Sequence, residues 1–274
     1  MTEKEITIDI LQEVAEGLRE NLHNLVFIGG IASFLYHFKT GTEPILYTYD
    51  LDTVFSKNSI TKDIDSASKT TGHSGLRKKI EKIGFEEIPG LGRGKSSGKF
   101  ITEKWGSKGK KVTIELLLPL RGKPRGWGQI EPGLKAEALR YLDILIDNLR
   151  QVELGDGLVI NIPHPARFVI QKLLVYEKRK RVEEKEKDAA YIADVINLYF
   201  RDINFILEEI KSMNEEYSKA PETKSWIKRA IDIYRKLFGE IISDGTVAAS
   251  DLLNIDSRII NKQAERFIVK LDKI

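Results

Sequence analysis

Tyr47-Thr-Tyr-Asp50-Leu-Asp52-Thr-Val-Phe55 is the stretch of sequence that decides the fold. Its β-branched and aromatic residues predict a strand. Residues two apart in a strand point to the same side, so this strand places the Asp50 and Asp52 carboxylates a few ångströms from one another, with Leu51 on the opposite face. Two like charges so close repel, and a divalent cation or a shared proton relieves the repulsion. An isolated pair of this kind is common on protein surfaces, so its neighbours in the sequence decide its meaning.

The segment before this strand favours a phosphate site. Leu25–Ile28 is a short apolar run that predicts a buried strand, and Gly29-Gly30 follows it at the start of a helix over residues 31–38. Glycines at a helix start let a phosphate approach the free backbone N–H groups.

The segment after it supplies a third carboxylate. Glu115 interrupts the run Val112–Leu118, which is otherwise apolar or β-branched. Burying a carboxylate there is costly unless a positive group meets it. If the two strands are neighbours, Glu115 lies beside Asp50 and Asp52, and the three acids could hold the paired metal ions of a phosphoryl-transfer site.

The rest of the chain predicts an α+β protein with a mixed sheet, followed by an all-helical part. Helices are expected over residues 6–25, 75–83 and 134–148, strands over 85–88, 99–105 and 111–118, and a hairpin over 151–154 and 158–162. From Pro165 onward the apolar spacing is helical. We therefore place two domains, at residues 1–163 and 164–274, with the active site expected in the cleft between them.

Composition narrows the class of protein. The chain has 274 residues, 41% hydrophobic and 31% charged, which is globular. The absence of cysteine excludes disulfides, thiolate metal sites and a cysteine nucleophile. No apolar run approaches the length of a membrane helix and the N-terminus lacks a signal-peptide core, so we expect a cytoplasmic protein without a membrane partner.

Positive charge gathers in one segment. Leu91–Arg125 carries ten basic and two acidic residues, a net +8 in a chain whose total is +3. Such a stretch is typical of phosphate or RNA binding, and a lysine-rich surface that maintains solubility is the alternative.

These motifs resemble a known superfamily. The order strand, Gly-Gly, helix, then Thr48-x-Asp50-Leu-Asp52 and a hydrophobic strand bearing a third acid resembles the nucleotidyltransferase superfamily that includes DNA polymerase beta. Pro165–Arg179, with Lys187-Asp188 further on, is similar to the helical segment of abortive-infection (AbiE-type) nucleotidyltransferase toxins.

The resemblance implies roles for individual residues. Asp50, Asp52 and Glu115 would be catalytic and would hold Mg²⁺ or Mn²⁺. The nucleotide-binding residues would be Gly29, Gly30, Thr48, Lys172 and Arg179. Leu46 stands where many relatives carry arginine, which bears on the substrate more than on the metal. For Lys172 the alternative is a solvated helix lysine, and Glu177–Asp188 is expected to be mostly a solvated helix face with opposite charges four apart.

Other motifs carry less weight. Asp63-Ile-Asp65 is a second acidic pair, but the polar residues after it favour a loop. Gly90–Ser96 lacks the spacing of a phosphate-binding loop and does not precede a helix. The four histidines show no metal-binding spacing.

The predicted function is metal-dependent transfer of a nucleoside monophosphate from an NTP to an acceptor hydroxyl, with pyrophosphate as the leaving group. RNA or protein is the expected acceptor. The protein could act as a toxin of a toxin–antitoxin or phage-defence system, and it would then have an antitoxin as partner. The alternatives are a non-catalytic protein of the same fold that binds nucleic acid or nucleotides, and an enzyme that modifies a small molecule such as an antibiotic.

Overall fold

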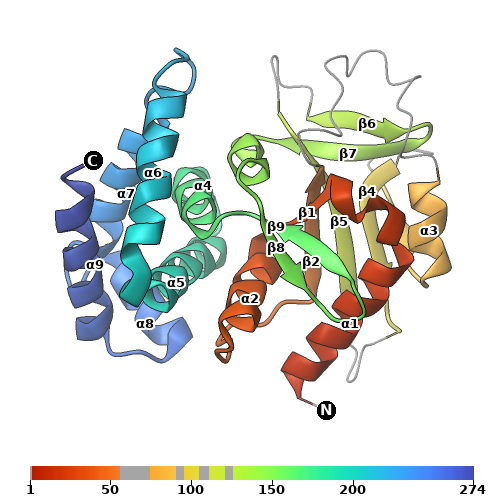
Figure 1. Cartoon of the computed structure of the whole chain (residues 1–274), viewed down its shortest axis with the longest axis horizontal. Helices are drawn as coiled ribbons and strands as arrows, with labels where there is room; N and C mark the ends of the chain where they lie inside the picture. Colours follow the sequence, from red (N-terminus) through yellow and green to blue (C-terminus); the bar gives the residue numbers. More distant parts are fainter. Residues whose placement is uncertain (1, 56–74, 91–95, 105–110, 121–125) are drawn as a thin grey trace. The chain divides into compact units, whose positions relative to one another are not determined.

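Strand β2 (Asp50–Phe55) lies in the middle of a mixed sheet in the computed structural model of the chain (Figure 1). The structure describes residues 2–55, 75–90, 96–104, 111–120 and 126–274. On one side β2 pairs antiparallel with β1 (Leu25–Phe27), and on the other it pairs parallel with β5 (Val112–Pro119). The three segments singled out in the sequence are therefore adjacent strands.

The remaining strands extend this sheet. β5 pairs antiparallel with β4 (Ser96–Thr102), which pairs with β3 (Glu86–Pro89). Beyond β1 lie β9 (Val159–Ile162) and β8 (Arg150–Glu153), the expected hairpin. Together with the C-terminal helices, this arrangement confirms the α+β class with a mixed sheet.

The chain forms two compact units. Unit 1 comprises residues 1–163 and contains the sheet, and unit 2 comprises residues 164–274. Unit 1 also contains α1 (Glu3–Gly17), α2 (Gly29–Thr40) and α3 (Leu76–Lys82). A 3₁₀ helix, Arg19–Asn24, follows α1 directly and occupies the end of the single helix expected over residues 6–25.

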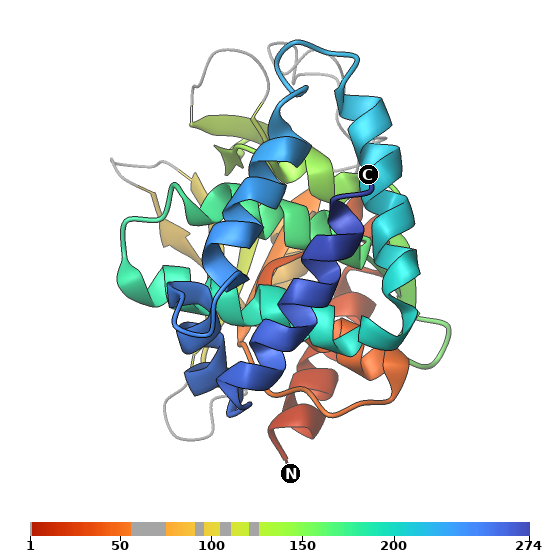
Figure 2. The same ribbon diagram turned by 90° about the vertical axis from the view of Figure 1, so that its left-hand side faces the viewer.

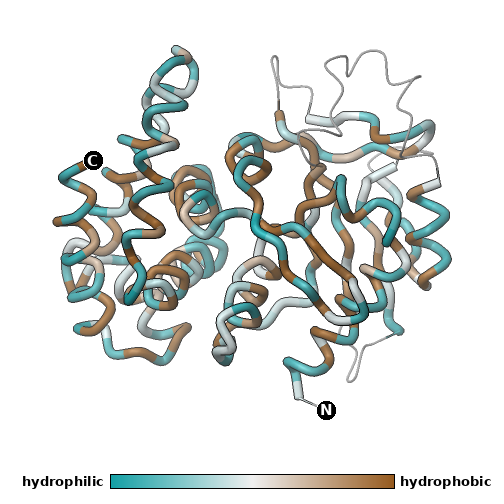
Figure 3. Tube along the Cα trace, viewed as in Figure 1, coloured by the Kyte–Doolittle hydropathy of each residue, from teal (hydrophilic) through white to brown (hydrophobic). Residues whose placement is uncertain are grey.

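The core of unit 1 lies against the central strands. Val26, Val54 and Leu117 are buried with residues of the 3₁₀ helix Leu142–Ile146. Figure 3 shows the central strands as mostly hydrophobic and the helices as mixed along their length. Burial on this scale fixes the register of β2 and β5, because a shift of one residue would move their apolar side chains to the opposite face.

Unit 2 is helical throughout. Its helices are α4 (Pro165–Tyr176), α5 (Val182–Leu198), α6 (Ile203–Tyr217), α7 (Trp226–Phe238), α8 (Asp244–Leu253) and α9 (Ser257–Leu271). Figure 2 shows α9 in dark blue, and this helix packs against α6, α7 and α8. Of the helices that the structure describes, none is both long and apolar enough to cross a bilayer.

The helix predicted over residues 134–148 is wrong. Strands β6 (Trp127–Glu131) and β7 (Leu134–Leu139) form a hairpin, and β7 pairs parallel with β5. Leu134 and Ala136 are buried while Lys135 between them is exposed, which is the alternation of a strand. Gly133 has a φ of 83° in the turn, a conformation that favours glycine.

The charge run at residues 177–188 also differs from the expectation. α4 ends at Tyr176 and α5 begins at Val182, so residues 177–181 connect two helices. Glu177 pairs with Arg229, at 2.5 Å, instead of with Arg181 four residues on. The pair predicted between Glu177 and Arg181 is absent because the helix is interrupted between them, and Arg181 instead lies near Glu183 and Glu184.

Candidate active site

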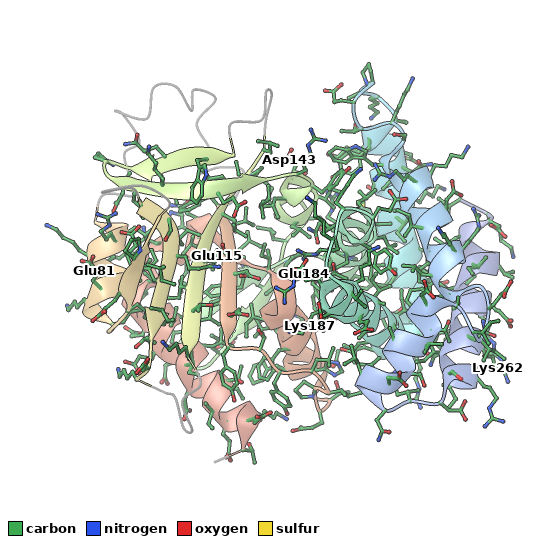
Figure 4. All side chains as sticks on the ribbon, turned by 180° about the vertical axis from the view of Figure 1, so that it is seen from behind. Glu81, Glu115, Asp143, Glu184, Lys187 and Lys262 are labelled. Atoms are coloured by element: carbon green, nitrogen blue, oxygen red, sulfur yellow. The ribbon has the colours of Figure 1, made fainter. Side chains whose placement is uncertain are left out.

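The backbone register brings the three predicted acids to one face of the sheet. Asp52 of β2 lies directly beside Glu115 of β5, and Asp50 lies beside Thr113. Leu51 and Ile114, which point to the opposite face, are buried, whereas Asp50 is exposed and Asp52 and Glu115 are half-buried. Figure 4 labels Glu115 on β5 beside β2. The acids therefore share one face of the sheet and lie where it reaches solvent, whereas Val54 and Leu117 further along the same face are buried.

Asp50 is oriented by two threonines. The Thr113 hydroxyl donates to Asp50 Oδ1 at 2.5 Å, and the Asp50 backbone N–H donates to the Thr48 hydroxyl at 3.1 Å. Thr48 thus shapes the entry into β2, a contact with its own strand. Its proposed contact with a nucleotide stays a prediction.

Glu115 has the positive partner that its apolar surroundings require. Lys99 of β4 lies opposite Glu115 in the register, and its ammonium is 3.2 Å from Glu115 Oε2. The Glu115 side chain is 23% exposed and that of Lys99 is 40% exposed. Sequence reasoning missed this role of Lys99 because only the register of β4 against β5 reveals it.

A fourth carboxylate, Glu137, lies at the edge of the same group. Glu137 of β7 lies beside Leu117 of β5, two residues beyond Glu115 and on the same face. Burial raises the pKa of Glu137, and the negative charge on Glu115 raises it further, whereas Lys99 lowers it. Glu137 was missed because its segment was expected to be helical.

The expected turn from a strand through Gly-Gly into a helix is present, and the structure gives a further reason why position 29 is glycine. β1 ends at Phe27, α2 begins at Gly29, and Gly29 has a φ of 66°. A Cβ on Gly29 would collide with the Asp52 carboxylate. Gly29 therefore lets Asp52 lie against the N-terminus of α2, where a helix end favours negative charge. Gly30 follows in the first turn, half-buried.

The acids suit Mg²⁺ or Mn²⁺ by chemistry and by strand register, since both ions prefer carboxylate oxygens. In the part of the chain that the structure describes, no three His, Cys, Asp or Glu side chains are already gathered around one point. Asp50 accepts from Thr113 and Glu115 faces Lys99. For these acids to hold one cation together, Asp50 would have to turn from Thr113 and Glu115 from Lys99.

Unit 2 contains a separate charged cluster. The Lys172 ammonium lies 2.6 Å from Asp188 Oδ1, and Arg179 donates to Asp188 Oδ2 at 3.0 Å. Lys172 also lies over the rings of Phe168 and Tyr191. Both members of the Lys172–Asp188 pair are buried, so the interpretation of Lys172 as a solvated lysine is wrong.

The role of Asp188 explains part of the helical motif. The Asp188 carboxylate of α5 holds both Lys172 of α4 and Arg179 of the segment that connects the two helices. The sequence did not indicate this shared contact. Contact of Lys172 and Arg179 with a nucleotide stays a prediction.

Much of the basic segment lies outside the described residues, including Lys108 and Lys110. The same holds for Asp63 and Asp65. The described lysines of the segment each meet a carboxylate: Lys99 meets Glu115, Lys104 meets Glu13 and Lys111 meets Glu103.

Acids on adjacent strands beside a helix start are suited to phosphoryl-transfer chemistry, in which carboxylates hold cations and backbone N–H groups hold phosphates. Residues 6–214 match the family described as Nucleotidyltransferase, and the chain belongs to this family. Its members transfer nucleoside monophosphates, so the protein is a transferase with an NTP as substrate. No curated protein matches the chain.

Proposed function

We propose that the protein uses Mg²⁺ or Mn²⁺, held by Asp50, Asp52 and Glu115, to transfer a nucleoside monophosphate to a hydroxyl group. The observation that supports this most is the register of Asp52 beside Glu115, with both side chains half-buried on one face of the sheet. The bound cation supplies charge neutralisation to the phosphates. The acceptor oxygen bonds to the α-phosphorus, the bond to the bridging oxygen breaks, and pyrophosphate leaves.

In this proposal Glu115 also takes the proton of the acceptor hydroxyl. Glu115 is half-buried beside Lys99, and a carboxylate positioned to accept a proton in the transition state contributes to the rate. Thr113 and Thr48 hold Asp50 in place. Positioning and charge neutralisation account for most of the catalysis in such a reaction.

The triphosphate lies at the Gly29-Gly30 helix start in this proposal, where backbone N–H groups and the positive end of α2 favour anions. Lys172 and Arg179 of unit 2 are proposed nucleotide contacts. An ammonium has three N–H donors, so Lys172 can remain bonded to Asp188 while it donates to a phosphate.

The proposed acceptor is RNA or protein. The motif of Lys172, Arg179, Lys187 and Asp188 supports a biological role as a toxin related to the AbiE type, in a toxin–antitoxin or phage-defence system. An antitoxin would then be its partner.

The experiment that tests the function combines NTP labelled at the α-phosphate with total RNA, total protein and small-molecule extracts, in buffer with Mg²⁺ or with EDTA. Metal-dependent label on a macromolecule supports the proposal. Label only on a small molecule indicates the antibiotic-modifying type of enzyme. NTP binding with no transfer, identical in the Asp52→Asn variant, contradicts catalysis and leaves a binding protein.

A further inference from the structure

The last helix of unit 2 carries a row of positive side chains. Arg258, Lys262, Arg266 and Lys270 of α9 are four residues apart, so they lie along one side of the helix. Lys273 follows beyond the helix end. From Arg258 to Lys270 the row is about 18 Å long at 1.5 Å per residue. Figure 4 shows Lys262 at the outer surface of α9.

Two hollows lie along this row and meet at its middle. The larger has a volume of about 700 Å³ and is lined by Arg201, Lys270 and Lys273 among others. The smaller has a volume of about 460 Å³ and is lined by Arg258 and Lys262. Phe200 and Arg266 line both hollows. The Arg266 guanidinium lies over the Phe200 ring, 5.9 Å from its centre.

The charge of this surface is largely uncompensated. Six cations line the two hollows, against the carboxylates of Asp202, Asp256 and Glu265. Among the six, only Arg258 forms an ion pair with any residue that the structure describes, and its partner is Asp256. Lys270 donates to the neutral side chain of Asn204.

Helix α7 provides the contrast within the same unit. Arg229 pairs with Glu177 at 2.5 Å, and Arg235 pairs with Asp232 at 2.9 Å and also with Asp272. Both arginines of α7 are thus paired with carboxylates, whereas Arg266 of α9 and the lysines of both helices form no ion pair with a residue that the structure describes. Exposed cations without carboxylate partners favour an external anion.

From these observations we infer that the two hollows along α9 bind a single-stranded nucleic acid, with phosphates on the α9 row and a base stacked at Phe200. The length of the row exceeds a single triphosphate, which favours an extended polyanion. An aromatic ring between cations is the arrangement that binds unstacked bases, because every base presents a π face. The α9 row lies beyond the family match at residues 6–214, whereas Phe200 and Arg201 lie within it.

The test uses the full-length protein and a fluorescein-labelled oligouridylate, with anisotropy measured over a range of salt concentrations. Each lost phosphate contact lowers the salt slope by about 0.7 for a single strand. Replacing Lys262, Arg266 and Lys270 together by alanine is expected to lower the slope by about 2 and to weaken binding at low salt at least tenfold. Phe200→Ala is expected to weaken binding roughly tenfold with an unchanged slope, since stacking carries no charge.

Two control variants make the result specific. Lys228→Ala with Lys236→Ala removes two exposed lysines of α7 that line neither hollow, and it is expected to leave affinity and slope unchanged. Asp52→Asn is also expected to bind the oligonucleotide like the wild type, which separates this inference from the proposed function. Thermal melting of each variant verifies that it is folded.

Several outcomes overturn the inference. The triple α9 variant could bind oligouridylate with the wild-type slope, or the α7 variant could lose as much affinity. The wild type could bind vesicles of anionic lipid and not oligouridylate, with vesicle binding lost in the triple variant. This result would assign the surface to membrane binding. Equal binding of duplex RNA with no effect of Phe200→Ala would refute the stacked, single-stranded mode.

Discussion

Glu115 of β5 lies in register beside Asp52 of β2, and it faces Lys99 on its other side. The same carboxylate thus belongs to an acidic group and to an ion pair at 3.2 Å. In the proposed function, a metal ion would therefore compete with the Lys99 ammonium for Glu115.

Removing one charge from the acidic group is expected to abolish tight metal binding. In Asp52→Asn, Mn²⁺-dependent NTP affinity should fall at least tenfold because one of three anionic ligands is lost. Calorimetry with and without EDTA measures this. Glu103→Gln, at an exposed pair with Lys111, is the matched control and should bind like the wild type. NTP affinity that is equal in both variants would contradict the metal site.

Removing the competing ammonium should strengthen metal binding. Lys99→Met removes the ion-pair partner of Glu115. A partly exposed ion pair contributes up to about 1 kcal/mol of free energy, so Mn²⁺ affinity should rise up to about fivefold. Lys111→Met removes a lysine that pairs with Glu103 instead and should have no effect. Mn²⁺ titration followed by electron paramagnetic resonance measures both. Weaker binding in Lys99→Met would show that Lys99 supports the site instead of competing for it.

Two glycines with similar backbone conformations allow the effect of backbone strain to be distinguished from the effect of a steric collision with Asp52. Gly29 and Gly41 have φ values of 66° and 69°, so alanine at either position should cost about 1 kcal/mol of stability. Only at Gly29 would the new Cβ meet the Asp52 carboxylate, since nothing lies within 4 Å at Gly41. Gly29→Ala should therefore also weaken Mn²⁺ binding, and Gly41→Ala should not. Urea unfolding and Mn²⁺ titration test the pair.

The buried pair in unit 2 should be costly to break from one side. Asp188→Ala leaves Lys172 buried without its counter-ion and should destabilise unit 2 by about 3–5 kcal/mol. Asp232→Ala, at an exposed pair with Arg235, should cost about 1 kcal/mol or less. Urea unfolding followed through Trp226, the single tryptophan of residues 164–274, reports on unit 2. Equal midpoints for the two variants would argue against a structural role of Asp188.

Glu137 gives a pH dependence with a definite sign. Its pKa in the folded protein is raised by burial and by Glu115, so the folded state binds its proton more tightly than the unfolded state does. Stability from this group is present below the unfolded pKa of about 4.5 and is lost as pH rises through the folded pKa. Glu137→Gln should therefore be more stable than the wild type at about pH 7 and no more stable at about pH 4. Urea unfolding at the two pH values decides this, and an equal gain at both would contradict it.

Local patterns were sufficient to predict the centre of unit 1. β2, the Gly-Gly start of α2 and the acid in β5 each have a signal within a few residues, and the parallel pairing of β2 with β5 confirms that their acids are neighbours. Lys99 and Glu137 have no such signal, because strand pairing alone brings them to Glu115. The spacing of Leu134, Ala138, Tyr141 and Leu145 fits a helix as well as a strand followed by a turn. The strand forms because β7 pairs with β5, a contact that the local sequence does not reveal.

The parallel pairing of β2 with β5 also sets when the site forms during folding. Asp50 and Thr113, which bond across these strands, are 63 residues apart in the sequence. Such non-local pairing forms slowly, because the loop-closure entropy is lost before the contacts form. A nascent or partly unfolded chain therefore lacks the acidic group, which is complete only once the central sheet has assembled.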